Sequence, residues 1–494
     1  MSTTAPARPV LPPAAAPART PVRSPGGPGR AAPARPLSVP RGAALYIGAL
    51  LGPGLLLLPG LAAAQAGPAS VLAWLALIIT SALLAGVFTA LGRAVPAGGG
   101  VIGYTAAGLG RRAGAAAGWC FLAGVICGAP IVCLIGASYV TDLAGGGPLL
   151  RAAVAGGLLL AVLGLALGGV RATTTAQLVL VALLIAVVVA AVTGAAPAAR
   201  AANWAPFAPH GWLAIGKAAA TLMLSFIGWE AVAPLTTRFA SPARQLPRVI
   251  AIAFGTTTAL YLGLAVTTIA TLGRGAGTSV PLADLLQIAI GPAGRAVAAA
   301  AALVLTLGAT NAYLTGATEM IRQLTAARRP RSTGLLPGQA RPAATRPAVT
   351  QPAVTQPAVT QPEAASPGPV QRLARPGSAR PFLLVIAAAG LLLIGLYALG
   401  LVSTAALVAL PTTMFLVVYV TCTASAARIL TGPARIAAVP ALLAVLAVLA
   451  FCGWALIAAA VVAGLAALTA PASSPALARP RIPAGVARVQ RDGA

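Results

Sequence analysis

Residues 49–67 read ALLGPGLLLLPGLAAAQAG, an uncharged apolar stretch that is interrupted by a Gly-Pro-Gly triplet at 52–54 and a Pro-Gly pair at 59–60. A helix of about 20 apolar residues crosses the hydrocarbon core of a bilayer, and this stretch is long enough once the residues before it are included. Glycine and proline interrupt helices, and lipid cannot satisfy the backbone groups that an interruption frees. The stretch therefore predicts a membrane span that is broken in its middle and faces a polar cavity there.

The composition of the whole chain also indicates a lipid environment. Hydrophobic residues make up 59% of the 494 residues, charged residues make up 8%, and the mean hydropathy is +0.91, which is outside the range of soluble globular domains. Apolar runs of span length recur along the chain, so we expect an all-α membrane protein with twelve transmembrane helices. The expected spans are residues 43–66, 69–92, 115–141, 149–169, 174–195, 212–236, 248–272, 294–325, 381–400, 402–428, 435–451 and 453–470.

The net charge of +27 and the pI near 11.8 raise the question of nucleic-acid binding. The cations do not gather on one face, because most of the arginines fall in alternate segments between the expected spans. Cytoplasmic segments of membrane proteins are enriched in Lys and Arg, so both termini are predicted to lie in the cytoplasm. We expect a multi-pass protein of the plasma membrane that binds no nucleic acid. The outer segments would then carry Arg151, Arg200, Lys217, Arg274 and Arg295.

The polar, Pro-rich segments define the expected domain boundaries. Residues 1–40 and 471–494 are predicted to be cytoplasmic tails, the first of them disordered, and residues 327–380 a disordered cytoplasmic loop that contains the repeat PAVTQPAVTQPAVTQ. A transport core at 41–326 holds the first eight spans, and residues 381–470 hold the last four. The loop is interpreted as a tolerated insertion, with contact to a partner or to anionic lipid through its arginines as the alternative.

Cysteine and histidine give no sign of a metal or disulfide framework. The five cysteines fall within expected spans or, for Cys452, at the junction of the last two, without a C-x-x-C pair, and the single histidine, His210, is expected in an outer loop. No nucleophile and base are paired near the interruptions, so we expect no enzyme activity and no cofactor. The cysteines are interpreted as small apolar packing residues: Cys120, Cys127, Cys133, Cys422 and Cys452.

Only six acidic residues occur in the chain, which makes their positions informative. Glu230 lies in the expected span 212–236, where an ionised carboxylate is costly unless it is paired, hydrated or protonated. We take Glu230 as the candidate proton-coupling residue, with a structural acid that caps free backbone donors as the alternative. Glu319 lies three residues before Arg322, where a local ion pair is the simpler interpretation. The other four acids are expected in solvated loops or tails: Asp142, Asp284, Glu363 and Asp492.

A second interruption lies in the segment MLSFIGWEAVAPL, residues 223–235, where Gly228 falls inside the span and Pro234 follows. The two interrupted spans are the first and the sixth, so they hold matching positions in two halves of five spans. A matched pair of interrupted spans is typical of secondary transporters built as inverted repeats. Either interruption alone would also fit an ordinary kink or packing residue.

Together the interruptions predict a site for a zwitterion. The N–H groups near Gly54 and Leu55 begin the second half of span one, and a helix N-terminus attracts a carboxylate. The carbonyl groups near Ser225 and Phe226 end the first half of span six and suit an ammonium group. A free amino acid carries both groups on one carbon atom, so we expect a free amino acid as substrate.

Three stretches resemble the amino acid-polyamine-organocation (APC) superfamily of permeases. They are GALLGPGLLLLPGLAAAQAGP (48–68), PAGGGVIGYTAAGLGRRAGAAAGW (96–119) and FIGWEAVAPLTTRFASPARQLPR (226–248), and they follow one another in the superfamily's order. The chain is most similar to the bacterial methionine and branched-chain amino acid exporters, which share the G-x-E-A run of span six and the NAY triplet at 311–313. The resemblance covers residues 41–325 well and the rest loosely.

The resemblance implies a five-plus-five inverted repeat with broken helices 1 and 6, plus two extra C-terminal helices. It also implies proton-driven movement of neutral, apolar amino acids. The apolar neighbours Leu55, Ile227 and Trp229 would favour side chains such as those of Met, Leu, Ile and Val. The substrate-binding candidates are Gly52, Gly54, Leu55, Leu56, Ser225, Phe226, Ile227, Gly228, Trp229 and Asn311.

Three positions depart from the superfamily pattern. Pro53 stands where relatives carry Ser, Thr or Ala, so a backbone donor and any hydroxyl contact are absent there. The span at 174–195 has no lysine, so the lysine-based proton coupling of some relatives cannot be transferred. Arg238 and Phe239 stand where many relatives carry acids, which removes the basis for ion pairs at the inner gate.

The predicted function is secondary active transport of a small neutral amino acid by alternating access, as proton-coupled efflux through Glu230. An importer or exchanger of other specificity remains open, because the motifs do not set the direction. A sensor or scaffold that acts through the loop at 327–380 is the alternative from another class. A sodium requirement is also left open by Thr306, Thr310 and Thr315 in span eight.

Overall fold

The computed structural model describes residues 37–52, 54–95, 100–168, 174–231, 239, 241–328 and 379–469. Most of the expected tails and of the expected loop at 327–380 lie outside these ranges. The described chain is helical, and its only strand-like pairing is an isolated bridge between Leu37 and Phe239. The prediction of an all-α protein is therefore confirmed.

The long helices begin and end within a few residues of most expected spans. Two shorter helices, α4 and α11, were not expected from the sequence. The helices are α1 (Val39–Leu50), α2 (Gly54–Ala66), α3 (Ser70–Ala94), α4 (Gly100–Leu109), α5 (Arg111–Ala144), α6 (Pro148–Leu167), α7 (Thr174–Ala195), α8 (Leu213–Leu222), α10 (Pro242–Leu272), α11 (Pro281–Ile290), α12 (Ala293–Arg328), α14 (Ala379–Ala398), α15 (Thr404–Ile429), α16 (Pro433–Leu449) and α17 (Ala455–Thr469).

Eight stretches of the described residues are long and apolar enough to cross a membrane. One of them, Gly54–Ala94, has 41 residues. As a single helix it would measure about 60 Å, twice the hydrocarbon thickness. Gly67 divides it into α2 and α3, because its φ of +60° is a left-handed conformation that glycine adopts without strain. The count of twelve spans stays a prediction, since α8, α16 and α17 are shorter than a full span.

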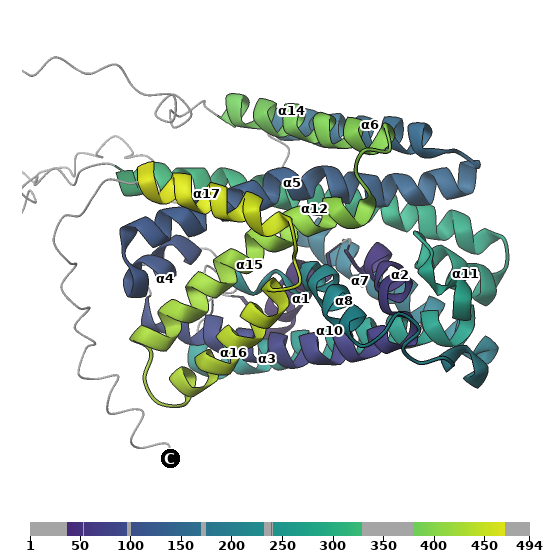
Figure 1. Cartoon of the computed structure of the whole chain (residues 1–494), viewed down its shortest axis with the longest axis horizontal. Coiled ribbons are helices and arrows are strands. Elements are labelled where there is room, and N and C mark those ends of the chain that lie inside the picture. Colours follow the sequence, from purple (N-terminus) through teal and green to yellow (C-terminus); the bar gives the residue numbers. More distant parts are fainter. Residues whose placement is uncertain are drawn as a thin grey trace, which may run out of the picture. The chain divides into compact units, whose positions relative to one another are not determined.

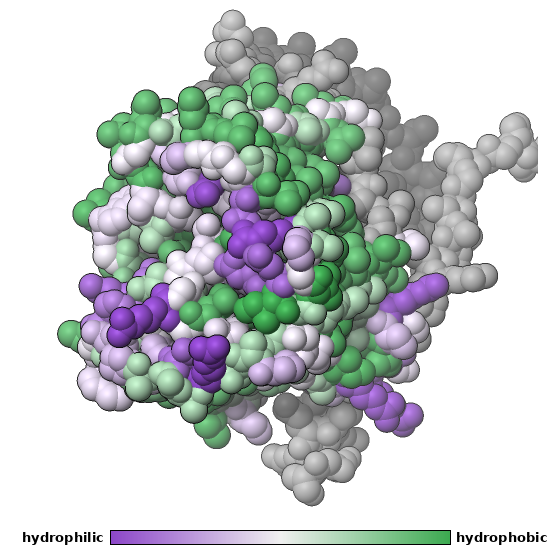
Figure 2. Space-filling view, turned by 90° about the vertical axis from the view of Figure 1, so that its right-hand side faces the viewer, coloured by the Kyte–Doolittle hydropathy of each residue, from purple (hydrophilic) through white to green (hydrophobic). Residues whose placement is uncertain are grey.

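Many large apolar side chains on the helix surfaces have no protein neighbour to cover them. Ile79, Leu392 and Leu465 are 65%, 63% and 59% exposed, as expected for side chains that contact acyl chains. Figure 2 shows the face at the α11 end of the described helices, where hydrophilic residues gather and apolar residues lie around them. The chain is thus a multi-pass membrane protein with a polar end surface.

The long helix α5 is the centre of the packing. It contacts α12 and α15 along much of its length, and α4, α6, α14 and α17 pack against it as well. Figure 1 shows α5 and α12 side by side, with α14 beside α6 on one flank. The other group of helices consists of α1 against α10 and α7, and α2 against α8. The broken spans lie within this second group.

Both expected interruptions are present as breaks in the helices. The first, which we call break one, comprises Leu51, Gly52 and Pro53 between α1 and α2, although Pro53 itself lies outside the described residues. The second, break six, comprises Ile227 and Gly228, where the backbone is extended at Ile227 and φ is +142° at Gly228. Break six separates the 3₁₀ turns η4 (Met223–Phe226) and η5 (Trp229–Ala231). The repeat that would relate the two breaks stays a prediction.

Helix α2 approaches the backbone of a distant segment at Gly60. A Cβ atom at this position would lie 2.0 Å from the carbonyl oxygen of Thr278, which lies three residues before the start of α11. Ala64, one turn later, lies against Gly277 in the same way. The residue at 60 must therefore be glycine for α2 to pack against this segment.

Gly60→Ala should lower the stability of the protein by about 1–3 kcal/mol, because the added methyl group forces two backbones apart. The measurement is thermal unfolding of the purified protein in detergent. Gly86→Ala is the matched control, since a Cβ at Gly86 in α3 would meet no atom within 4 Å. Equal unfolding temperatures for the two variants would contradict the close approach.

Candidate functional site

The two breaks face each other through Gly54 and Ser225. A Cβ at Gly54 would lie 3.1 Å from Ser225 Oγ and 3.0 Å from Leu58 Cδ1, so α2 begins directly beside the end of η4. A Cβ at Gly52 would meet nothing within 4 Å, so this side of break one borders open space. Gly54 and Ser225, which lie far apart in the sequence, are therefore in contact in the structure.

The carbonyl ends of both broken helices converge on one tyrosine hydroxyl. Tyr261 of α10 has its hydroxyl oxygen 2.7 Å from the carbonyl oxygen of Leu50, which ends α1, and 2.6 Å from that of Ser225 in η4. A phenol has one proton, which it donates to these two acceptors in turn or shares between them. The negative ends of two helix dipoles thus meet at a single donor, and this place suits an additional donor or a cation.

The ring of Tyr261 belongs to a buried aromatic group. Its centroid lies 5.2 Å from that of Trp74 in α3 and 5.2 Å from that of Phe226. Two polar atoms in this region, Trp74 Nε1 and Ser225 Oγ, are buried without a hydrogen-bond partner in the structure. Buried polar atoms are nearly always satisfied, so these two mark a place where a partner group is missing.

Glu230 follows break six and binds the backbone of that break. Its Oε2 atom accepts a hydrogen bond of 2.6 Å from the Tyr419 hydroxyl of α15 and one of 3.1 Å from the Gly228 N–H. The Tyr419 oxygen in turn accepts from the N–H groups of Gly228 and Trp229, at 3.0 and 3.3 Å. No Arg or Lys of the described residues forms an ion pair with Glu230. The carboxyl group therefore both caps free donors and connects span six to α15.

The side chain of the candidate Trp229 binds to α3. Its indole Nε1 donates to Ser81 Oγ of α3 at 2.8 Å, and the side chain is 1% exposed. Phe226 and Ile227 are also buried, at 4% and 6%. Trp229 as a substrate-binding residue stays a prediction, and it would require the indole to contact the ligand with or without its bond to Ser81.

Leu55 and Leu56 lie fully buried in the first turn of α2. The Leu55 N–H donates to the Gly52 carbonyl at 3.2 Å across break one. The Leu56 carbonyl accepts a hydrogen bond of 2.7 Å from the Tyr139 hydroxyl of α5. A third tyrosine thus connects a broken helix to a neighbouring span.

Asn311 is half-buried in α12. In the same helix, the Thr306 hydroxyl lies 3.5 Å from the Val132 carbonyl, while Thr310 and Thr315 donate to carbonyls one turn back in α12. The side chain of Glu319 lies outside the described residues. Asn311 as a substrate contact therefore stays a prediction.

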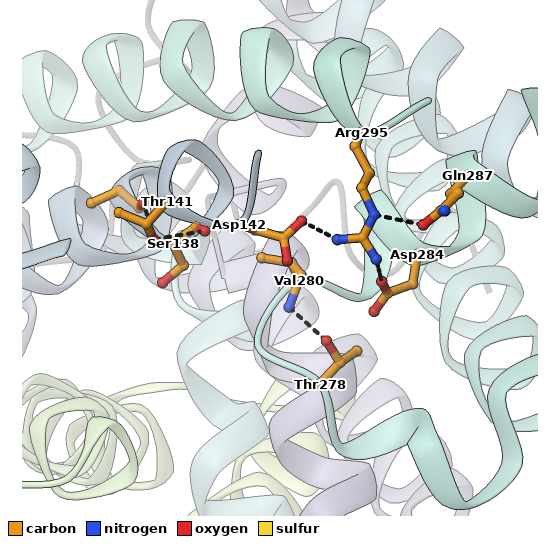
Figure 3. Close-up of polar contacts among 9 residues, drawn as sticks. Ser138, Thr141, Asp142, Thr278, Val280, Asp284, Gln287 and Arg295 are labelled. Atoms are coloured by element: carbon orange, nitrogen blue, oxygen red, sulfur yellow. Dashed lines mark hydrogen bonds and ion pairs between the residues drawn. The ribbon is translucent and has the colours of Figure 1, made fainter. Parts of the chain in front are cut away.

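Two acids that the sequence indicated as solvated instead take part in an ion-pair cluster. Arg295, at the start of α12, donates through Nη1 to Asp142 of α5 and through Nη2 to Asp284 of α11, the second at 2.9 Å. Its Nε donates to Gln287 of α11 at 2.5 Å, so the guanidinium lies between the two carboxylates (Figure 3). The expectation failed because α11, which carries Asp284, was not expected as a helix.

Partial burial alters the ionisation of Asp284 in this cluster. Burial raises the pKa of the Asp284 carboxyl above its ordinary value, while the Thr278 hydroxyl and the charge of Arg295 oppose the shift and Asp142 adds to it. Asp284 therefore takes up a proton at a higher pH than an exposed aspartate would.

Tyrosines were the residues that the sequence analysis missed. The chain has only seven, and Tyr139, Tyr261 and Tyr419 each donate to a group at or beside a break. A tyrosine inside an apolar span needs a partner for its hydroxyl, so mid-span tyrosines carry a signal of freed backbone groups. A prediction based on the acidic residues alone leaves this signal out.

Tyr261→Phe should destabilise the protein by about 1–3 kcal/mol, since it leaves the buried Ser225 carbonyl without its donor and removes one of the two donors of the Leu50 carbonyl, which keeps the Gly52 N–H. Thermal unfolding measures the effect. Tyr397→Phe removes the same atom from a half-buried tyrosine, whose hydroxyl accepts from Arg151, and it should cost less. If Tyr261→Phe unfolds no earlier than Tyr397→Phe, the hydroxyl does not hold the two ends together.

Comparison with known proteins agrees with this arrangement. The family model described as amino acid permease matches residues 37–328, which include both breaks and the Tyr139 and Tyr261 contacts. An uncharacterized amino acid permease of Bacillus subtilis, YecA, is 31% identical over 285 residues, which are 58% of this chain and 67% of that protein.

Two further relatives have names that state their substrates. The L-methionine/branched-chain amino acid exporter YjeH of Escherichia coli is 31% identical over 47% of this chain and 55% of its own length. The branched-chain amino acid permease BcaP of Bacillus subtilis is 26% identical over 50% of this chain and 57% of its own. The chain thus spans little more than half the length of these two relatives. On the evidence of the family match, the chain belongs to the amino acid permeases of the APC superfamily.

Proposed function

We propose that this protein moves small neutral amino acids of the Met, Leu, Ile and Val class across the plasma membrane by alternating access, as proton-coupled efflux. The observation that carries the proposal is the meeting of the two breaks, where Ser225 Oγ lies buried and unpaired beside Gly54. The substrates named for two relatives support the choice of amino acid. Both termini would lie in the cytoplasm, and arginine-rich segments on that side would contact anionic lipids.

The chemistry of the breaks supports an amino acid as the ligand. The start of α2 offers N–H groups of the first turn, and the Ser225 hydroxyl adds a donor that replaces the one lost at Pro53. The carbonyls of Leu50 and Ser225, which share the Tyr261 hydroxyl, would accept further hydrogen bonds from an ammonium group; Leu50 also accepts one from the Gly52 N–H. The buried side chains of Leu55, Phe226 and Ile227 make the surroundings apolar. A polar zwitterion with an apolar side chain matches all three features.

Proton coupling is assigned to Glu230. Its carboxyl group connects break six to α15 through Tyr419, so a change in its charge would alter the bond that joins these two elements. A carboxyl group at this depth exchanges a proton more readily than it remains ionised without a cation. Movement of the proton would then accompany the opening of one side of the site.

An importer or exchanger of other specificity, driven by protons or by sodium, would use the same breaks. Counterflow in proteoliposomes against a panel of labelled amino acids, with and without a pH gradient, decides substrate and coupling. The scaffold alternative predicts instead that deletion of residues 335–375 abolishes partner binding. Transport should survive this deletion if the loop is a passive linker.

Glu230→Gln should abolish the response of transport to an imposed pH gradient, because the amide cannot carry the proton. The measurement is uptake or release of labelled L-methionine and L-leucine by proteoliposomes at set inner and outer pH. Glu363→Gln makes the same chemical change in the loop at 327–380 and should leave the response intact. A Glu230→Gln protein that still follows the pH gradient at the wild-type rate would remove Glu230 from the coupling mechanism.

Ser225→Ala should weaken binding of L-leucine about tenfold, which corresponds to about 1.4 kcal/mol for one hydrogen bond to a charged group. The same change should leave binding of 3-methylbutylamine unaffected, because this amine has the leucine side chain without its carboxylate. Equilibrium binding of the two compounds to purified protein gives the comparison. Equal losses for both, or no loss for L-leucine, would show that Ser225 does not contact the carboxylate.

A further inference from the structure

The ion-pair cluster of Arg295 joins three elements at one end of the protein. Arg295 belongs to α12, Asp142 to the last turn of α5, and Asp284 and Gln287 to α11. Figure 3 shows the guanidinium between the two carboxylates, so one cation connects α11 to both of the long central helices. The planar guanidinium presents several donors in a fixed fork, which suits such a bridge.

Helix α11 is also fixed to the half-helix of break one. The Thr278 carbonyl, three residues before α11, lies against Gly60 of α2. The Tyr139 hydroxyl of α5, one turn before Asp142, donates to the Leu56 carbonyl of α2. Leu56 is two residues from Gly54, so the chain of contacts runs from the Arg295 cluster to break one.

These contacts make the segment from η6 (Gly273–Gly277) through α11 a cover over α2. Ala276 of η6 is 3% exposed and packs with Ala63 of α2 and Ile269 of α10 in a small apolar cluster of its own. The cover has few apolar contacts at this point, whereas its far end, α11, is held by the ion pairs together with the buried side chains of Leu282, Leu285 and Leu286. Anything that exposes α2 at this end of the protein has to separate the cover from α2.

We infer that Arg295, Asp142 and Asp284 form a latch that holds α11 and η6 closed over α2, and that the latch opens whenever the site becomes accessible from this end. This inference rests on the proposed function, since it assigns one closed side of alternating access to named side chains. In the predicted orientation the latch lies on the outer face. It is separate from Glu230, which acts at break six.

The size of the effect follows from the exposure of the pairs. The side chains of Arg295, Asp142 and Asp284 are 31%, 24% and 19% exposed, so water screens the pairs in part. Pairs of this kind contribute roughly 1 kcal/mol or less each. A latch of this strength would keep the cover closed most of the time and still allow it to open during transport.

The test measures how fast a cysteine under the cover reacts. Ala276→Cys provides the reporter, and a maleimide is applied to the purified protein in nanodiscs, where both faces are accessible. Arg295→Gln should raise the labelling rate about fivefold, in line with the loss of roughly 1 kcal/mol. Asp284→Asn and Asp142→Asn should each raise it less. In the Arg295→Gln background neither should add a further increase, because they remove the same contacts.

Two controls distinguish opening of the latch from a general loss of packing throughout the protein. Arg274→Gln removes an exposed arginine of η6 outside the cluster and should leave the rate unchanged. Native Cys422, fully buried in α15, reports opening of the whole protein and should stay unreactive in every variant. If Arg295→Gln does not fold, the single Asp284→Asn variant gives the same comparison.

The latch is overturned if the reporter reacts at the parent rate in Arg295→Gln and Asp284→Asn, or if Arg274→Gln has the same effect. It is also overturned if Cys422 becomes reactive together with the reporter, because the variants would then loosen the whole protein. Labelling needs no substrate. A failed latch therefore appears as an unchanged labelling rate, whereas failure of the proposed function appears as absent amino acid counterflow in the wild-type protein.

Discussion

The structure depends on the hydrogen bonding of backbone groups that two broken helices free inside an apolar environment. Lipid cannot satisfy these groups, and each one left unpaired costs several kcal/mol. Tyrosine hydroxyls from unbroken helices supply partners. Tyr261 donates to the carbonyls of Leu50 and Ser225, and the Tyr419 oxygen accepts hydrogen bonds from the N–H groups of Gly228 and Trp229. The breaks are tolerated because three neighbouring spans each direct a phenol at them, and Tyr139 is the third.

Because tyrosine hydroxyls already bind these backbone groups, ligand binding at the site requires the tyrosine contacts to change. A tyrosine bound to a helix-end carbonyl satisfies it without a ligand, so a ligand's ammonium group has to share or replace that contact. The same holds for Glu230 and Tyr419 at break six. Ser225 Oγ and Trp74 Nε1 have no such partner, so they are the groups at which a ligand would add a bond rather than exchange one.

The sequence predicted the local features well and the long-range ones poorly. Breaks at Gly52 and Gly228 follow from the conformational preferences of glycine and proline, and apolar run length set most helix boundaries within a few residues. Helix α11 was missed because its ten residues are too few for a span. Without it, Asp142 and Asp284 could only be interpreted as solvated. The side-chain partners of Trp229 and Glu230, which are Ser81 and Tyr419, lie more than 140 residues away in the chain, and no local pattern specifies such pairs.

The central claim is that an amino acid binds where the two breaks meet. An experimental structure of the protein with bound L-leucine tests it most directly. The account predicts ligand density beside Gly54 and Ser225, with the carboxylate at the start of α2 and the ammonium group at the carbonyls of Leu50 and Ser225. Density for L-leucine at any other place, with the Tyr261 contacts unchanged, would contradict it.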